Sequence, residues 1–388
     1  MGMGETSAWL DGSAVAARLG IKAQTLYAYV SRGRIEARPD PTDPRKSLYS
    51  AEDVTRLFER KSQGRKPADV ARGAISWGEP VLASAITDVA GGKLYYRGAD
   101  ATALARTETL EQVALRLWAC DDAEIFAREP GPKVRMKGSA QARAFAALAF
   151  RAGTEAPALG RSPAALWREG AALMADLAGA LGDGFEPGPL HLVLAGAWGL
   201  DKRGADLVRR ALVLLADHEL NASTFAARVA ASTGASLSAS VLAGLAALSG
   251  PRHGGAAARI SALIEEAERA GPEAAVKAFI ARGDAPPGFG QRPYPAGDPR
   301  ARALFSAFRP SPELIELGTA AEALTGHKAN IDFALAALTR TIGLPPDAPF
   351  ALFALGRSTG WIAHAIEQLE SGALIRPRAR YVGPPPSA

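Results

Sequence analysis

Proton-transfer chemistry is the chemistry that the ionisable side chains of this sequence favour. Asp332 lies among Ile, Phe and Leu residues, and such apolar surroundings raise the proton affinity of a carboxylate and suit it to work as a general base. An alternative is that Asp332 or Asn330 caps the helix that follows. His218 and His253 each lie where an apolar helix meets a loop rich in Asn or Gly. Each imidazole can therefore face a cavity and be oriented by a neighbour.

These residues lie in a chain segment that is Ala-rich and has the apolar periodicity of helices from about residue 74 onward. Gly-Pro pairs separate the helical stretches. One hairpin is expected within residues 84–96, with its turn at Gly91-Gly92. The segment is therefore predicted to be mainly α, with helices at 207–215, 226–248, 257–270, 312–324 and 352–369.

Ala, Ser, Gly and Thr make up 16 of the 23 residues of the predicted helix 226–248. Small side chains let two helix backbones approach closely, so we expect this helix to be central or to lie in a subunit interface. The alternative is a general bias of the whole chain toward alanine.

Seven short motifs follow one another in this segment: SAITDVAGGKLYYRG, ADHELNASTFAARVAAST, GPRHGGA, GFGQRPYPAGDPRA, NIDFALAALTRTIGLP, LFALGRSTGWIAHAIEQ and LIRPRARYVGP. Each is weak alone, but their order and spacing resemble the citrate synthase family over residues 74–388. The resemblance implies a helical fold with a large and a small subdomain, the small one at about 255–343.

The resemblance also implies a condensation of acetyl-CoA or propionyl-CoA with oxaloacetate, which yields citrate or methylcitrate and CoA. His253 corresponds to the histidine that hydrogen-bonds the thioester carbonyl as the acyl group enolises. Asp332 corresponds to the base that removes the methyl proton. Polarising the carbonyl lowers the pKa of the carbon acid, so that a weak carboxylate base can remove its proton.

Binding roles follow from the same resemblance. Guanidinium groups fork onto carboxylate oxygens, and three arginines match those that bind the two carboxylates of oxaloacetate. The last of them, Arg376, is supplied by the partner subunit in the family, which implies a homodimer. The thioester is a substrate, so no cofactor is implied. The residues expected to bind oxaloacetate are His218, Asn221, Arg300, Arg357 and Arg376, and those expected to bind CoA are Arg252 and Arg292.

One catalytic position departs from the family. Gln291 stands in GFGQ where the family has a second catalytic histidine, which polarises the ketone of oxaloacetate and protonates the developing alkoxide. An amide can donate a hydrogen bond to that ketone, but it cannot give up a proton. Loss of a general acid costs on the order of 10²–10⁴ in rate, so slowed turnover is expected.

Residues 1–60 are expected to form a small separate domain. A helix at 14–19, with Ser13 as N-cap and Gly20 at its end, precedes a helix at 23–31. Strands at 34–38 and 46–49 and a helix at 54–60 follow. This order resembles the winged helix-turn-helix of excisionase and MerR-type proteins. Residues 61–73 are polar and basic and are predicted to be a linker.

The positive charge of the chain is concentrated in the same region. Residues 1–73 hold 13 Lys and Arg against 9 Asp and Glu, so most of the net charge of +5 lies there. This asymmetry favours a module that binds nucleic acid, whereas protein binding and a solvated basic extension are the alternatives. The candidate DNA contacts are Lys22, Gln24, Thr25, Tyr27 and Arg32.

Composition sets the outer limits. The chain has 388 residues, 48% of them hydrophobic, and no apolar run long enough to cross a membrane. A single cysteine, Cys120, excludes an intramolecular disulfide, and no cluster with metal-ligand spacing is present, so the cytoplasm is expected and no metal is. Two hypotheses remain: an acyltransferase of the tricarboxylic acid cycle, or a catalytically impaired DNA-binding regulator that senses acyl-CoA or dicarboxylates.

Overall fold

The computed structural model describes residues 9–21, 23–31, 34–40, 43, 46–62, 82–127, 137–184, 188–251, 253–254, 256–379 and 381–384. The chain divides into two compact units, one of residues 1–83 with 378–388, and one of residues 84–377. No helix within the described ranges is long and apolar enough to cross a membrane.

The described part of the N-terminal unit contains three helices and a three-stranded antiparallel sheet in the order β1-β3-β2. The strand β3 is central, with Tyr49 opposite both Leu10 and Ala37. The elements are β1 (Trp9–Asp11), α1 (Gly12–Leu19), α2 (Ala23–Ser31), β2 (Ala37–Pro39), β3 (Ser47–Ser50) and α3 (Ala51–Ser62).

This unit has a small hydrophobic core of its own, made of Val15, Leu19, Leu26, Ile35, Tyr49 and Val54. Helix α1 ends at Gly20, whose φ of 59° is the left-handed conformation that glycine adopts without strain. The predicted N-cap at Ser13 is wrong: Asp11 caps α1, because its carboxylate accepts a hydrogen bond from the Ala14 amide at 2.8 Å. Helix α3 continues to Ser62, two residues beyond the predicted domain end.

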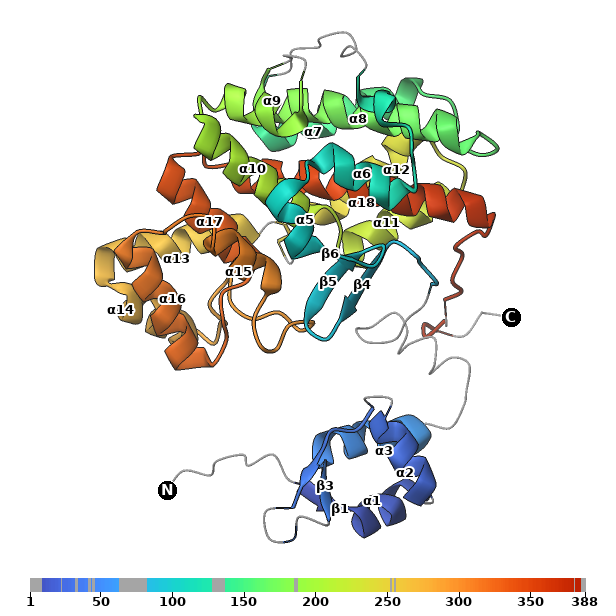
Figure 1. Ribbon diagram of the computed structural model, residues 1–388, viewed down its shortest axis with the longest axis vertical. Coiled ribbons are helices and arrows are strands. Elements are labelled where there is room, and N and C mark those ends of the chain that lie inside the picture. Colours follow the sequence, from blue (N-terminus) through green and yellow to red (C-terminus); the bar gives the residue numbers. More distant parts are fainter. Residues whose placement is uncertain are drawn as a thin grey trace. The chain divides into compact units, whose positions relative to one another are not determined.

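The body, residues 84–377, is mainly α as predicted, and its described residues form one small sheet (Figure 1). Its strands are β4 (Thr87–Ala90), β5 (Lys93–Tyr96) and β6 (Ala99–Asp100), and Ala123–Phe126 is a short 3₁₀ turn. The helices are α5 (Ala101–Thr107), α6 (Leu110–Trp118), α7 (Ala140–Thr154), α8 (Pro163–Gly182), α9 (Leu190–Ala197), α10 (Lys202–Leu215), α11 (Ala222–Ser232), α12 (Leu237–Leu248), α13 (Ala256–Ala270), α14 (Pro272–Ala281), α15 (Pro299–Phe305), α16 (Pro312–Thr325), α17 (Ile331–Ile342) and α18 (Ala348–Ser371).

The predicted hairpin is confirmed. Strands β4 and β5 pair antiparallel with Ala90 opposite Lys93, and the turn residues Gly91 and Gly92 have φ of 58° and 72°. Two successive positive φ values are those of a type I′ turn, which explains why two glycines stand there. Strand β6 pairs with β5 and was not expected.

The single helix predicted at 226–248 is wrong, because the structure has two helices there, α11 and α12. Gly234 has a φ of 83°, which ends the first helix, and the Ser236 hydroxyl caps the second by accepting from the Ala239 amide. Small residues do allow a close approach: a Cβ added to Gly244 of α12 would lie 2.7 Å from the Trp361 ring of α18.

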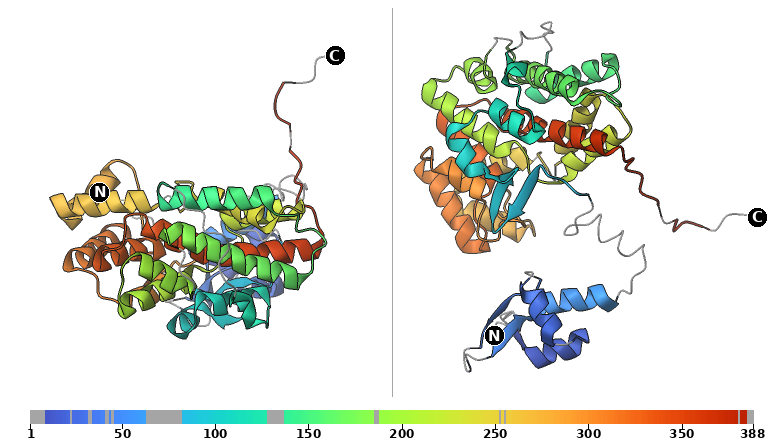
Figure 2. Two further views of the ribbon diagram at one scale, coloured as in Figure 1. Left: turned by 90° about the horizontal axis from the view of Figure 1, so that it is seen from above. Right: turned by 45° about the vertical axis from the view of Figure 1, so that its right-hand side comes forward.

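Helix α18 is the centre of the body. Of its 24 residues, 20 are buried, and it contacts α6, α7, α8, α10, α11, α12 and α17. A second group of helices, α13 to α17, packs together beside it, and both turned views in Figure 2 keep this group on one side of the body. The predicted site residues are divided between the two groups: some lie on or next to α10, α11 and α18, and others lie on or next to α13, α15 and α17.

Candidate active site

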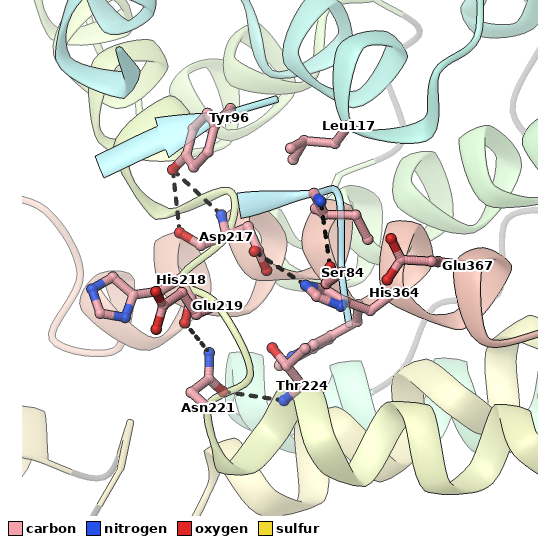
Figure 3. Close-up of polar contacts among 12 residues, drawn as sticks. Ser84, Tyr96, Leu117, Asp217, His218, Glu219, Asn221, Thr224, His364 and Glu367 are labelled. Atoms are coloured by element: carbon pink, nitrogen blue, oxygen red, sulfur yellow. Dashed lines mark hydrogen bonds and ion pairs between the residues drawn. The ribbon is translucent and has the colours of Figure 1, made fainter. Parts of the chain in front are cut away.

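The site lies where five segments of the body meet. These are the connection between α10 and α11, the turn before α13, the loop before α15, the first turn of α17 and the middle of α18. Figure 3 shows the first of these segments, with His218 and Asn221 on it. Hydrogen bonds and charge interactions link the residues that these segments carry, namely His218, Asn221, His253, Gln291, Arg300, Asp332 and Arg357.

His218 is a buried and neutral histidine. Its Nε2 lies 2.9 Å from the hydroxyl of Tyr294, which comes from the loop before α15. Burial first, and then the charges of Arg300 and Arg357, hold the pKa of His218 well below its usual value. This imidazole therefore acts in hydrogen bonding rather than as a cation.

His253 is oriented by Ser223 of α11. The Ser223 hydroxyl lies 2.9 Å from Nε2 of His253 and 2.7 Å from Oδ1 of Asn221, and it accepts a hydrogen bond from the Trp361 indole at 3.2 Å. Oδ1 of Asn221 already accepts two backbone amides at the start of α11. Burial, followed by the charge of Arg357, lowers the pKa of His253 to about 4, so this histidine is also neutral near pH 7.

Asn330, rather than Asp332, caps α17. Oδ1 of Asn330 accepts from the amides of Asp332 at 3.0 Å and of Phe333 at 3.3 Å. The carboxylate of Asp332 is thus not used for capping. Burial raises its pKa to about 6, although the positive charge of Arg300 opposes this.

Arg300 joins the loop before α15 to the start of α17. Its guanidinium makes two hydrogen bonds to Asp298, at 3.0 and 2.9 Å, and Asp298 also accepts from the Ile331 amide at 3.0 Å. The side chains of Arg300 and Asp298 are 2% and 1% exposed, so this is a buried ion pair. The same arginine donates through Nη2 to Oε1 of Gln291 at 2.8 Å.

Gln291 therefore has a defined orientation. Arginine only donates hydrogen bonds, so the oxygen of the Gln291 amide must face Arg300 and its NH₂ group must point away. Hydrogen bonds also hold the backbone next to Gln291. The Gly290 amide donates to the Lys328 carbonyl at 2.8 Å, and the Asn330 side chain donates to the Gly290 carbonyl at 3.1 Å.

Arg357 is a buried cation at the middle of α18. Its Nε donates to the Leu215 carbonyl at 2.9 Å, whereas Nη2 has no hydrogen-bond partner in the described part of the chain. Burial lowers its pKa to about 10, and Asp217 opposes that shift. Arg300 and Arg357 together place two buried guanidinium groups close enough to His218 and Asp332 for their charges to act on them. Such a pair is suited to bind an anion with more than one carboxylate.

The other predicted residues lie elsewhere. Arg376 is exposed in the segment after α18, and Arg292 is exposed on the loop before α15. Lys22, Arg32 and Arg252 lie outside the described residues, whereas Gln24, Thr25 and Tyr27 are exposed on α2. Sequence reasoning missed Ser223, Tyr294 and Asp298, although all three lie inside the motifs that carried the resemblance.

A separate pocket of about 250 Å³ lies between the ends of α14 and α16, and Phe289 connects it to the loop that carries Gln291. It is lined by Ile280, Asp284, Ala285, Pro286, Phe289, Leu324, Thr325 and His327. Among the described residues, no group of three or more His, Cys, Asp or Glu side chains is placed to hold a metal ion.

Comparison with known sequences identifies relatives of the body of this chain. Residues 185–378 match the family model described as citrate synthase, C-terminal domain. A putative citrate synthase 2 of Mycobacterium tuberculosis is 41% identical over 199 residues, which are 48% of this chain and 53% of the relative. A citrate synthase of Haloferax volcanii is 39% identical over 191 residues, 46% of this chain and 50% of the relative. The chain thus spans about half the length of the curated relatives it matches.

Solved structures align over more of the chain. Citrate synthase from Thermotoga maritima gives a TM-score of 0.66 at 26% identity and covers 80% of this chain and 96% of that one. Citrate synthase from Thermoplasma acidophilum, in a ternary complex with carboxymethyl coenzyme A and oxaloacetate, gives 0.65 at 26% identity over 80% and 95%.

Proposed function

The chain belongs to the citrate synthase family, and from that premise we propose that it condenses acetyl-CoA or propionyl-CoA with oxaloacetate and releases CoA. The observation that carries this proposal is the state of Asp332. Its carboxylate is left free by Asn330, its pKa is raised to about 6, and it lies close enough to two buried arginines for their charges to act on it. This is the environment of a carboxylate that removes a proton and returns it near neutral pH.

The first step of the proposed reaction forms an enol. Asp332 takes a proton from the carbon next to the thioester carbonyl, while His253 hydrogen-bonds the carbonyl oxygen. We propose that His253 presents Nδ1–H to this oxygen, which requires the Ser223 hydroxyl to turn its proton from Oδ1 of Asn221 to Nε2 of His253, 2.9 Å away. The neutral imidazole, whose pKa is about 4, stabilises developing negative charge without becoming a competing acid.

The second step forms the carbon–carbon bond. The enol carbon attacks the ketone carbon of oxaloacetate, whose carboxylates are bound by Arg300 and Arg357, with His218 and Asn221 beside them. Nη2 of Arg357, which has no partner in the described structure, is the donor left for this role. Water then cleaves the thioester to leave citrate, or methylcitrate, and CoA.

Gln291 has a limited role in this scheme. Because Arg300 holds its oxygen, its NH₂ group is the side that can donate to the ketone oxygen. The amide polarises the ketone, but the proton that the new alkoxide takes up must come from water.

We further propose that Arg292 and Arg252 bind CoA phosphates.

The first prediction concerns Asp332→Ala. We expect the parent to release CoA from acetyl-CoA and oxaloacetate, and the variant to lose on the order of 10³-fold or more in kcat, because no base remains. The parent rate should fall as the pH drops through about 6, where Asp332 takes up its proton. CoA release is followed with a thiol reagent. Glu316→Ala, an exposed carboxylate on α16, is the matched control. A parent silent with both acyl-CoA substrates contradicts the proposal.

The second prediction concerns Gln291→His. A histidine here supplies a proton donor, so kcat should rise by about tenfold or more, since general acids contribute 10²–10⁴ in rate. Gln291→Ala, which removes the donor altogether, should lower kcat below that of the parent. If the histidine variant is no faster than the parent, proton supply at this position does not limit the reaction.

The third prediction concerns Arg376, which we propose is supplied by the partner subunit of a homodimer. Arg376→Ala and Asp332→Ala chains should each be inactive alone. A mixed dimer regains one intact site, because one chain supplies Asp332 and the other supplies Arg376. Random co-assembly should therefore restore about one quarter of the parental activity. Absence of complementation in co-expressed, co-purified dimers would place Arg376 in its own subunit's site.

A second function is proposed for the N-terminal unit, namely binding to duplex DNA. Its supporting observation is that α2 is anchored through Leu26, which is buried, while Gln24, Thr25 and Tyr27 are exposed. We expect labelled duplex DNA to bind the full chain, with affinity that falls as salt rises, and Gln24→Ala/Tyr27→Ala to weaken it. Fluorescence anisotropy measures this. Absent or salt-independent binding would contradict a DNA role and leave protein contact as the alternative.

A further inference from the structure

His364 is a fully buried histidine that the proposed reaction does not use. It lies on α18, two turns after Arg357 and one turn after Gly360, so the three residues share one face of the helix. This face packs against the connection between α10 and α11, since the Gly360 amide donates to the Ala216 carbonyl at 2.9 Å. Figure 3 shows His364 directed at Asp217 of that connection, with His218 directed elsewhere.

The hydrogen bonds define the tautomer of His364. Nη1 of Arg228 lies 3.1 Å from Nδ1 of His364, and an arginine nitrogen can only donate. Nδ1 is therefore the acceptor, and the ring proton is on Nε2, which lies 3.3 Å from Oδ2 of Asp217. His364 thus donates to an ionised Asp217, and Arg228 is in turn paired with Glu367 at 2.5 Å.

Asp217 is a completely buried carboxylate next to His218 in the chain. Burial opposes its ionisation, but His364 and Arg357 hold its pKa below its usual value. Helix α18 approaches Asp217 so closely that a Cβ added to Gly360 would lie 2.2 Å from Oδ1 of Asp217. Glycine at position 360 therefore allows the contact between His364 and Asp217. Asp217 also opposes the fall in the pKa of Arg357 that burial causes.

We infer that His364 and Asp217 are positioning residues for the acceptor acid. The His364–Asp217 hydrogen bond fixes the segment that presents His218, and it keeps a negative charge facing the arginine that binds a substrate carboxylate. Glu367, the partner of Arg228, connects these residues to the segment just before β4, since its carboxylate accepts a hydrogen bond from the Ala85 amide at 2.8 Å. Glu219 attaches the segment to the hairpin through the Val89 amide at 3.2 Å. The inference rests on the proposed function, because it assigns these residues to the acceptor site of that reaction.

The test compares His364→Asn with His364→Gln. The Gln amide nitrogen reaches the place of Nε2 and can donate to Asp217, whereas the shorter Asn reaches only the place of Nδ1. Asn therefore loses the bond to Asp217. Since a hydrogen bond to a charged group contributes about 1.5–3 kcal/mol, we expect the KM for oxaloacetate to rise about tenfold or more in His364→Asn, and to stay within about threefold in His364→Gln. The KM for acetyl-CoA should change little in either variant.

Calorimetric binding of oxaloacetate to the parent and both variants separates two failures. A parent that neither binds oxaloacetate nor releases CoA refutes the proposed function itself. If the parent does both, and both variants keep its KM and affinity for oxaloacetate, the positioning role is refuted. If both variants lose affinity equally, His364 contributes packing alone, which also refutes the positioning role. If His364→Asn does not fold, Asp217→Asn removes the negative charge that acts on Arg357 and should also raise the KM for oxaloacetate, while thermal unfolding verifies that this variant folds.

Discussion

The body is organised around a cation buried in its central helix. Arg357 is 1% exposed, and a charge without water must be compensated by dipoles and opposite charges from the protein. The Leu215 carbonyl at the end of α10 and the carboxylate of Asp217 in the connection between α10 and α11 provide that compensation. The path of this connection is thereby set by α18. Gly356 and Gly360 make this contact sterically feasible, because an added Cβ at either would lie within 3 Å of that connection or of α10.

The sequence predicted the helical class of the body and the hairpin because both follow from local patterns, namely apolar periodicity and two successive glycines. It failed at 226–248, where most residues are small, local composition gives no clear interruption, and the break depends on the φ of Gly234. It also left the roles of Asn330 and Asp332 open, since either side chain suits a cap. Only the geometry of the amides shows that Asn330 takes that role. Contacts such as Arg300 with Gln291, or His364 with Asp217, join segments whose proximity no local pattern specifies.

The amide at position 291 has a structural consequence as well as a chemical one. Arg300 is already committed to Asp298 through two hydrogen bonds, and the Gln291 oxygen takes up a further donor on Nη2. The guanidinium is therefore held in place before substrate arrives, which lowers the entropy lost on binding. A protonated histidine would instead bring a second cation to Arg300. Gln291 thus holds the Arg300 guanidinium in a fixed place for the proposed acceptor, and unlike a histidine its amide cannot donate a proton.

The charges of the site also imply an order of events. Arg300 and Arg357 both lower the pKa of Asp332, and burial raises it to about 6 against their effect. A bound dicarboxylate neutralises these two cations, so we expect the pKa of Asp332 to rise further once the acceptor is in place. A stronger base is then available only when the ketone that will trap the enol is already bound. In the proposed reaction, the same two arginines would therefore bind the acceptor and, by being neutralised, raise the basicity of Asp332.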